Sequence, residues 1–354
     1  MSLALPAPLA LPRRLPPGMT LLVLLCMAIV VAVQCGAVPV RSGDWLSLLW
    51  PDSAMAANST PGGSYVLWNL RLPRALFALL AGAALGLSGA LTQGLFRNPL
   101  AEPTLLGVTS GAACAAALTI VVVSGMHLAL PDGWRMWLLP AAAFTGALLV
   151  CFVLDYAARW LVPGSIAGLL LTGIALNAIA TAVIGLCTYM ANDEQLRSLS
   201  FWTLGSLAGA RWPLVAVLGV VLALALLAVR RLTRSMNALA LGEAAAAHVG
   251  INVSRLRTQV ILLVALTAGF AIAWTGIIGF IGLIAPHFIR SWAGPDQRRV
   301  VPLSMLLGGL LMIVADTVAR TVAIPAEIPV GVFTALLGAP FFLAILRAAR
   351  HRIA

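Results

Sequence analysis

The stretch Ser235 to Arg257 reads SMNALALGEAAAAHVGINVSRLR and is the longest segment between two strongly apolar runs that is polar enough to lie outside a bilayer. Its alanine-rich middle, Ala238 to Val249, favours a helix, and Gly250 predicts a stop at the helix C-terminus. We therefore expect a short helix at about 238–250, held at a membrane surface with a compact apolar face suited to docking into another protein. An ordinary interfacial helix between two spans is the alternative.

The composition around this stretch indicates an integral membrane protein. Of the 354 residues, 61% are hydrophobic and 9% are charged, and the mean hydropathy of +1.02 exceeds what one soluble core could bury. The formal charge of +11 comes from 22 arginines without any lysine. These arginines form short clusters between apolar runs, a pattern that encodes membrane topology and argues against nucleic-acid binding. Five widely spaced cysteines are typical of small buried side chains.

Apolar runs of about 20 residues mark the expected transmembrane helices. The fold class predicted is all-α, with ten transmembrane helices and one short cytoplasmic coupling helix. The ten runs are 19–38, 73–95, 104–124, 137–159, 166–189, 213–229, 258–274, 276–292, 301–319 and 330–346.

Ten spans place both termini on one side of the membrane. With both termini in the cytoplasm, fifteen of the 22 arginines lie inside and seven outside, as the positive-inside rule requires. The expected organisation is a cytoplasmic tail at 1–18, one transmembrane domain at 19–350 and a cytoplasmic tail at 351–354. The nearly contiguous runs 258–274 and 276–292 are the weak point, because one bent element there would change the parity.

The chemistry that the sequence lacks narrows the function. A P-loop needs a lysine, so this chain has no nucleotide-binding motif of its own, and any ATP hydrolysis belongs to another subunit. Ion-coupled carriers commonly place an ionisable side chain inside the bundle, yet no predicted span has one near its middle. Asp155 and Asp316 lie toward span ends, and Asp316 stands four residues before Arg320, where an ion pair is the ordinary explanation.

No enzymatic or metal site is expected. The four histidines, including His248, are scattered without partners at metal-ligand spacing. The sequence has no nucleophile elbow and no paired acids placed for hydrolysis. We therefore assign no catalytic residue, no metal ligand and no permanently bound cofactor.

Several long strings resemble the FecCD-type permeases, the membrane subunits of ABC importers for iron chelates, haem and cobalamin. These strings are the coupling segment LGEAAAAHVGIN, Arg71-Leu72-Pro73-Arg74, GAALGLSGALTQGLFRNPLAEPTLLGVTSGA from Gly82, GFIGLIAPHFIR from Gly279, and the segment Ala315 to Phe342. The resemblance covers roughly Trp68 to Arg350, and the first 60 residues show no comparable match.

The resemblance implies a homodimer in the bacterial inner membrane, surrounded by lipid. Two ATPase subunits would bind the coupling helices from the cytoplasm, and a periplasmic substrate-binding protein would dock on the opposite face. The coupling residues implied are Ala240, Leu241, Gly242, Glu243, Ala244, His248, Val249 and Gly250.

Arg71, Arg74 and Arg320 are external in the predicted topology, where the family presents arginines to acidic side chains of the binding protein. The planar guanidinium suits this role because it binds a carboxylate at two points. The alternative is structural: Arg320 would serve only Asp316, and Arg71 and Arg74 would anchor a helix end to lipid headgroups.

The segment after the fifth span is expected to rim the pathway mouth. It contains Met190, Arg197 and nearby aromatic residues, a mixture that suits a large planar ligand with carboxylates and resembles the haem branch of the family. Haem propionates could pair with Arg197, unless this arginine only balances Asp193 or Glu194. The cargo expected is haem, with an iron siderophore or cobalamin as alternatives and an ion-coupled secondary transporter as the competing class.

Overall fold

The computed structural model describes residues 16–46, 62–123, 132–162, 165–324 and 326–353. These residues form helices and connecting turns. The α-helices are α1 (Pro17–Gln34), α2 (Ser42–Leu46), α3 (Gly63–Tyr65), α4 (Leu72–Phe96), α5 (Val108–Leu118), α6 (Asp132–Leu161), α7 (Ile166–Met190), α8 (Asp193–Leu204), α9 (Trp212–Leu239), α10 (Glu243–His248), α11 (Val253–Thr275), α12 (Ile281–Ala293), α13 (Gln297–Thr321) and α14 (Val330–Ile353). The π-helical turns η2 (Val66–Arg71) and η4 (Thr119–Val123) and the 3-10 helix η3 (Pro103–Leu106) complete the set.

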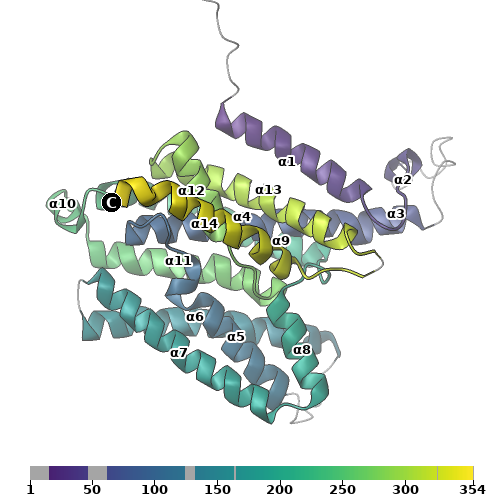
Figure 1. The fold of residues 1–354 in the computed structure, drawn as a ribbon, viewed down its shortest axis with the longest axis horizontal. Helices are drawn as coiled ribbons and strands as arrows, with labels where there is room; N and C mark the ends of the chain where they lie inside the picture. The colour runs from purple at the N-terminus through teal and green to yellow at the C-terminus, as the bar shows by residue number, and fades with distance from the viewer. Residues whose placement is uncertain (1–15, 47–61, 124–131, 163–164, 325, 354) are drawn as a thin grey trace, which may run out of the picture.

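The long helices run side by side, with α10 at one end of the molecule and α2 and α3 at the other (Figure 1). Helix α4 is the centre of the bundle and packs against α9, α11, α12 and α13. Helices α5, α6 and α7 form a layer beyond α11, and α1 packs on the far side of α13. The two ends of this arrangement, called here the α10 end and the α2–α3 end, carry the candidate sites.

Seven helices in the described ranges are long and apolar enough to cross a membrane. They agree with seven of the ten predicted runs to within a few residues at most ends. There are two exceptions. The second span begins at Gly63, ten residues before its predicted start at 73. Helix α9 continues ten residues beyond the predicted end at 229, because Thr233, Met236 and Leu239 stay buried at helical spacing after the arginine cluster begins. The multi-pass membrane fold predicted from composition is therefore correct, whereas the count of ten spans is not established.

Two of the three remaining predicted runs are shorter or interrupted in the structure, whereas the run 330–346 lies within the continuous helix α14. The run 104–124 is divided into η3, α5 and η4, with a break at Gly107, whose φ of 76° ends the 3-10 helix. The run 276–292 is helical only over α12, whose 13 residues extend about 20 Å, less than the roughly 30 Å hydrocarbon core. Because Gly276–Phe280 is not helical, α11 and α12 are two elements rather than one bent helix.

The packing of α4 against α13 explains the glycine stripe in the second predicted span. A Cβ atom at Gly82 would collide with the carbonyl oxygen of Gly308, and one at Gly86 would collide with that of Ser304. Small residues of this kind allow two helix backbones to touch. These glycines thus serve packing within the chain.

The coupling helix and the C-terminal tail differ from the predicted boundaries. Instead of 238–250, α10 covers six residues, because Ala238 and Leu239 still belong to α9 and Gly242 turns the chain with a φ of 115°. The predicted stop at Gly250 is correct, since its φ of 82° is left-handed. Helix α14 continues through the predicted tail as far as Ile353. Most of the predicted N-terminal tail lies outside the described residues.

Candidate functional site

Arg71 joins the end of α1 to the beginning of α4 at the α2–α3 end. The residue is only 8% exposed. Its Nη1 donates to the carbonyl oxygens of Val33 and Gln34 at 3.0 and 3.2 Å, and its Nη2 donates to that of Val38 at 2.5 Å. The last carbonyl groups of a helix have no partner within the helix, so Arg71 satisfies the end of α1. This geometry matches a structural role more closely than a free docking group.

Arg74 binds two carboxylates at once. Its Nε and Nη2 donate to Asp316 on α13 at 2.9–3.2 Å, and its Nη1 donates to Glu327 at 3.0 and 3.1 Å. The two acidic side chains differ in environment: that of Asp316 is 5% exposed and that of Glu327 is 46% exposed. The bond to Asp316 is therefore an interior tie, whereas the bond to Glu327 is open to exchange.

Arg320 contributes a third guanidinium near the same place. It donates to the carbonyl oxygens of Ala32 and, at 2.7 Å, of Cys35 at the end of α1. The ion pair with Asp316 predicted from the i to i+4 spacing is present at 3.7 Å, but Arg74 is the nearer partner of this carboxylate.

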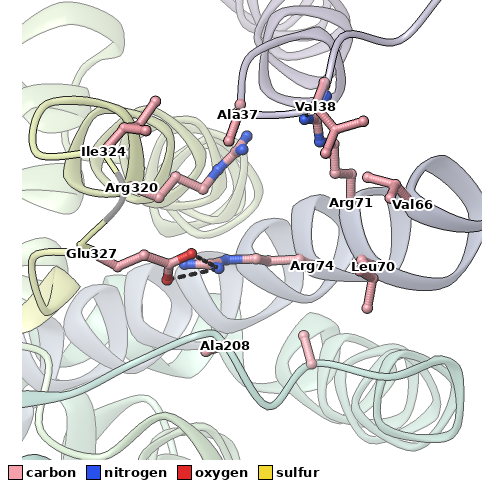
Figure 2. A pocket seen from close by; sticks show the side chains of 12 residues that line it. Ala37, Val38, Val66, Leu70, Arg71, Arg74, Ala208, Arg320, Ile324 and Glu327 are labelled. Atoms are coloured by element: carbon pink, nitrogen blue, oxygen red, sulfur yellow. Dashed lines mark hydrogen bonds and ion pairs between the residues drawn. The ribbon is translucent and has the colours of Figure 1, made fainter. Parts of the chain in front are cut away.

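The three arginines and Glu327 line a cavity of about 430 Å³ between the α1–α2 connection, η2, α4 and the α13–α14 connection. Figure 2 shows Arg71 and Arg320 on one side of this cavity and the Arg74–Glu327 pair across it. Three guanidinium groups against Asp316 and Glu327 leave the cluster net positive. Such a cluster can receive the carboxylate of a partner, with Glu327 as the group that must make room.

Helix α10 presents apolar side chains at the other end of the molecule. It is attached through Ala246, which is fully buried, while Leu241 and Val249 flank it with 81% and 69% of their surface exposed. Exposed aliphatic side chains on a loop outside the spans are typical of a surface that another protein covers. Ala240, Ala244 and Gly250 are exposed on the same loop, and Gly242 is half-buried.

Glu243 and His248 also hold the loop in shape. Glu243 accepts a hydrogen bond from Arg257 of α11 at 3.1 Å, and the Arg257 side chain is almost buried. The Nδ1 atom of His248 lies 2.9 Å from the carbonyl oxygen of Ala244 within the same helix. Glu243 therefore fixes the angle of α10 on α11, a role that the sequence did not suggest.

The corner between α7 and α8 carries the predicted pathway residues. Met190, 64% exposed, ends α7, and Arg197 is exposed on the second turn of α8. A capping box between Asn192 and Gln195 begins α8. Within the described residues, no ion pair joins Arg197 to Asp193 or Glu194.

Among the residues that the structure describes, no three His, Cys, Asp or Glu side chains gather closely enough to hold a metal ion.

The family model described as the FecCD transport family matches residues 21–348. The chain belongs to the FecCD transport family. The match begins inside α1, so the family likeness extends further toward the N-terminus than the motifs alone suggested.

Curated FecCD relatives are permease subunits by name. The hemin transport system permease protein HmuU of Yersinia pestis is 42% identical over 296 residues, which cover 83% of this chain and 87% of that one. The vitamin B12 import system permease protein BtuC of Pectobacterium atrosepticum is 41% identical over 280 residues, which cover 79% and 82%. Among solved structures, a metal-chelate type ABC transporter in an inward-facing conformation matches with a TM-score of 0.78 and 31% identity, covering 93% of this chain and 98% of that one.

Sequence reasoning missed Glu327 as part of this FecCD permease's arginine cluster. Glu327 precedes Ile328-Pro329 in a short connection between two apolar runs. A lone acidic residue in such a connection was the sequence signal that could have indicated a partner for an arginine. Its partner Arg74 is 253 positions earlier in the chain. Only the fold brings the two together.

Proposed function

We propose that the chain is the permease subunit of an ABC importer that carries haem across the bacterial inner membrane by ATP-driven alternating access. The observation that carries this proposal is the 42% identity with a hemin permease over 296 residues. The chain has no P-loop lysine, so two partner ATPase subunits supply the hydrolysis. Their states bias the permease through differential binding to its inward- and outward-open forms.

The ATPase contact in this proposal is the loop Ala240–Gly250 of each copy in a homodimer. Leu241 and Val249 supply its exposed apolar surface, and the Glu243–Arg257 pair keeps that surface at a fixed angle to α11. With α10 in the cytoplasm, both chain termini are cytoplasmic. Leu241→Asp should lower ATPase association by about tenfold or more, whereas the exposed control Ser254→Asp should leave it unchanged.

The periplasmic binding protein docks, in this proposal, over the arginine cluster of Arg71, Arg74 and Arg320. Arg71 and Arg320 are largely occupied by carbonyl oxygens. The partner's carboxylate therefore reaches Arg74 by displacing Glu327, which is the exposed member of the cluster. Glu327 lies three residues before the start of α14, so docking acts directly on that helix.

Haem would pass the α7–α8 corner on its way into the pathway. Exposed Tyr189, Met190 and Phe201 provide flat apolar contacts for a porphyrin, and Arg197 provides a positive charge for a propionate. Cobalamin is the second candidate, because the BtuC relative is 41% identical over 280 residues.

Reconstitution in proteoliposomes with the cognate ATPase and binding protein tests the proposal. Haem should be taken up only when ATP is present in the compartment that holds the ATPase. Arg197→Glu should reduce haem uptake. Arg211 is another exposed arginine at the same end, and the control Arg211→Glu should leave uptake unchanged. Uptake of cobalamin or a ferric siderophore in place of haem would reassign the cargo. Uptake by the permease alone, driven by a proton or sodium gradient, would refute an ABC permease.

A further inference from the structure

A cationic groove lies between α9 and α13, near the α10 end. Arg230 and Arg234 on α9 and Arg298 on α13 line a cavity of about 410 Å³ whose floor includes Val229 and Val301. All three arginines are exposed, and both valines are buried. Arg230 directly follows the apolar run of α9, and Arg298 stands with Arg299 just before that of α13. The cavity is therefore located where the bilayer changes from hydrocarbon to headgroups.

In the described part of the chain, Asp296 is a carboxylate close enough to this groove to attract one of its arginines, Arg298, and it does so without forming an ion pair. None of its three arginines has an ion pair among the residues that the structure describes, although four other arginines do. The nearby carboxylate of Asp296 is already used at the start of α13, where it accepts hydrogen bonds from Asn237 at 2.7 Å and from the backbone of Arg298 at 3.0 Å. The hydrogen bond from the backbone of Arg298, that from Asn237, and the positive charges of Arg298 and Arg299 hold the pKa of Asp296 below its usual range.

The walls of the groove are held at a fixed separation. Asn237 on α9 donates to Asp296 and accepts from the backbone N–H of Gln297 at 2.9 Å. This clamp joins the end of α9 to the beginning of α13 within one turn of Arg234. The three guanidinium groups are thus presented by two helices that cannot easily separate there.

An apolar groove continues from the cationic one. Leu226 lines both cavities, and the second, about 210 Å³ in volume, is formed almost wholly by aliphatic side chains, among them Leu25, Leu222, Met305 and Leu306. It extends toward the middle of the bilayer between α1, α4, α9 and α13. A positive headgroup site joined to a hydrocarbon channel has the shape and polarity of a phospholipid.

We propose that this composite groove binds an anionic phospholipid. The phosphate is held by the guanidinium forks of Arg230, Arg234 and Arg298, because Arg matches phosphate oxygens at two points. One acyl chain lies along Leu222 and Leu226. Basic pockets between transmembrane helices on the cytoplasmic side select anionic lipids in this way, and a zwitterionic lipid gains less because its ammonium group is repelled.

Native mass spectrometry of the full-length permease, purified and titrated with phosphatidylglycerol or phosphatidylethanolamine, tests the proposal. The triple variant Arg230→Gln, Arg234→Gln, Arg298→Gln should bind phosphatidylglycerol about 100-fold more weakly, at roughly fivefold per arginine. The matched control Arg231→Gln, Arg255→Gln, Arg299→Gln removes the same charge from exposed arginines outside the groove and should lose less than threefold. Equal losses in both variants would overturn the site, because the effect would then be surface charge alone.

A second pair of variants separates a lipid from a free phosphate. Ala223→Trp fills the apolar cavity and should weaken phosphatidylglycerol binding without affecting soluble glycerophosphoglycerol, whereas Ala228→Trp, exposed on α9 away from both cavities, should change nothing. Unchanged lipid binding in Ala223→Trp would overturn the acyl-chain part. A triple groove variant that keeps lipid binding but loses ATPase association would show a protein-docking surface instead. The melting temperature and elution volume of every variant confirm folding.

Discussion

Two clusters of arginines at opposite ends of this molecule have opposite environments. At the α2–α3 end, Arg71, Arg74 and Arg320 are largely buried and bonded to carboxylates or helix-end carbonyl groups. In the groove near the α10 end, Arg230 and Arg234 are exposed and have no ion pair in the described part of the chain. One residue type thus ties helices together at one end and remains available for ligands at the other.

Burial decides which role an arginine has. A guanidinium removed from water loses several kcal/mol of hydration free energy, so it persists only where acceptors surround it. Asp316 and the carbonyl groups at the end of α1 supply those acceptors. An exposed arginine keeps its hydration, and losing it changes the folding free energy little. Four substitutions test this contrast, from the largest expected effect to the smallest.

Asp316→Ala should have the largest effect, because it leaves Arg74 buried against α13 without its principal carboxylate. We expect the free energy of unfolding to fall by about 3–5 kcal/mol, measured by chemical unfolding in detergent. Asp316→Asn, which keeps the size and one acceptor, should recover part of the loss. A loss below about 1 kcal/mol in Asp316→Ala would show that the pair is not an interior tie.

Arg71→Ala should have the next largest effect on the free energy of unfolding, a loss of about 2–4 kcal/mol, because it removes three hydrogen bonds from a charged donor, two to carbonyl groups at the end of α1 and one to that of Val38 beyond it. Amide hydrogen exchange should rise around residues 33–38. The control Arg211→Ala removes an exposed arginine from the same end. If both variants unfold alike, the contrast between buried and exposed arginines fails.

These first two tests also show what a sequence can and cannot predict. Hydropathy located most membrane-spanning helices, and Gly250 marked the end of the coupling loop correctly. The spacing of Asp316 and Arg320 predicted an ion pair that is present at 3.7 Å, longer than the 2.9 Å pair between Asp316 and Arg74. The stronger partner, Arg74, is 242 positions away, so no local pattern reveals it.

The helix boundaries that the sequence missed have a similar cause. Gly276–Phe280 is apolar, so hydropathy extends a span through a segment that is not helical. In the structure this segment packs against the α8–α9 connection and α14. The carbonyl oxygen of Ile277 lies against Gly331, and the ring of Phe280 lies against Gly338. Phe280 donates its backbone N–H to Glu102 at 3.1 Å, a long-range bond that composition cannot show.

Glu327→Gln should have a smaller effect than the first two substitutions, and it should strengthen an interaction: the affinity for the binding protein should rise. Without the negative charge, Arg74 is released from its exposed partner, and docking of the binding protein should strengthen by about two- to tenfold, equivalent to roughly 1 kcal/mol or less. Surface plasmon resonance on nanodisc-embedded permease measures this change. Glu194→Gln, exposed on α8, is the control. Weaker docking in Glu327→Gln would mean that this carboxylate orients Arg74 for the partner instead of competing with it.

Arg234→Gln should have the smallest effect on folding, within about 0.5 kcal/mol, since its side chain has no ion pair in the described residues. Arg74→Gln, measured in the same unfolding assay, provides the direct comparison across the two ends and should cost several times more. A loss in Arg234→Gln as large as that in Arg74→Gln would erase the distinction between the ends.

The glycine contacts between α4 and α13 have a mechanical consequence. Because the backbone of each helix rests directly on the other at Gly82, Gly86 and Gly308, no layer of side chains exists there to absorb a displacement. The two helices must tilt as a single stiff lever. Arg74 is near one end of this lever and Arg298 at the other, so a displacement imposed at the Arg74 end is transmitted to the opposite end of the bundle.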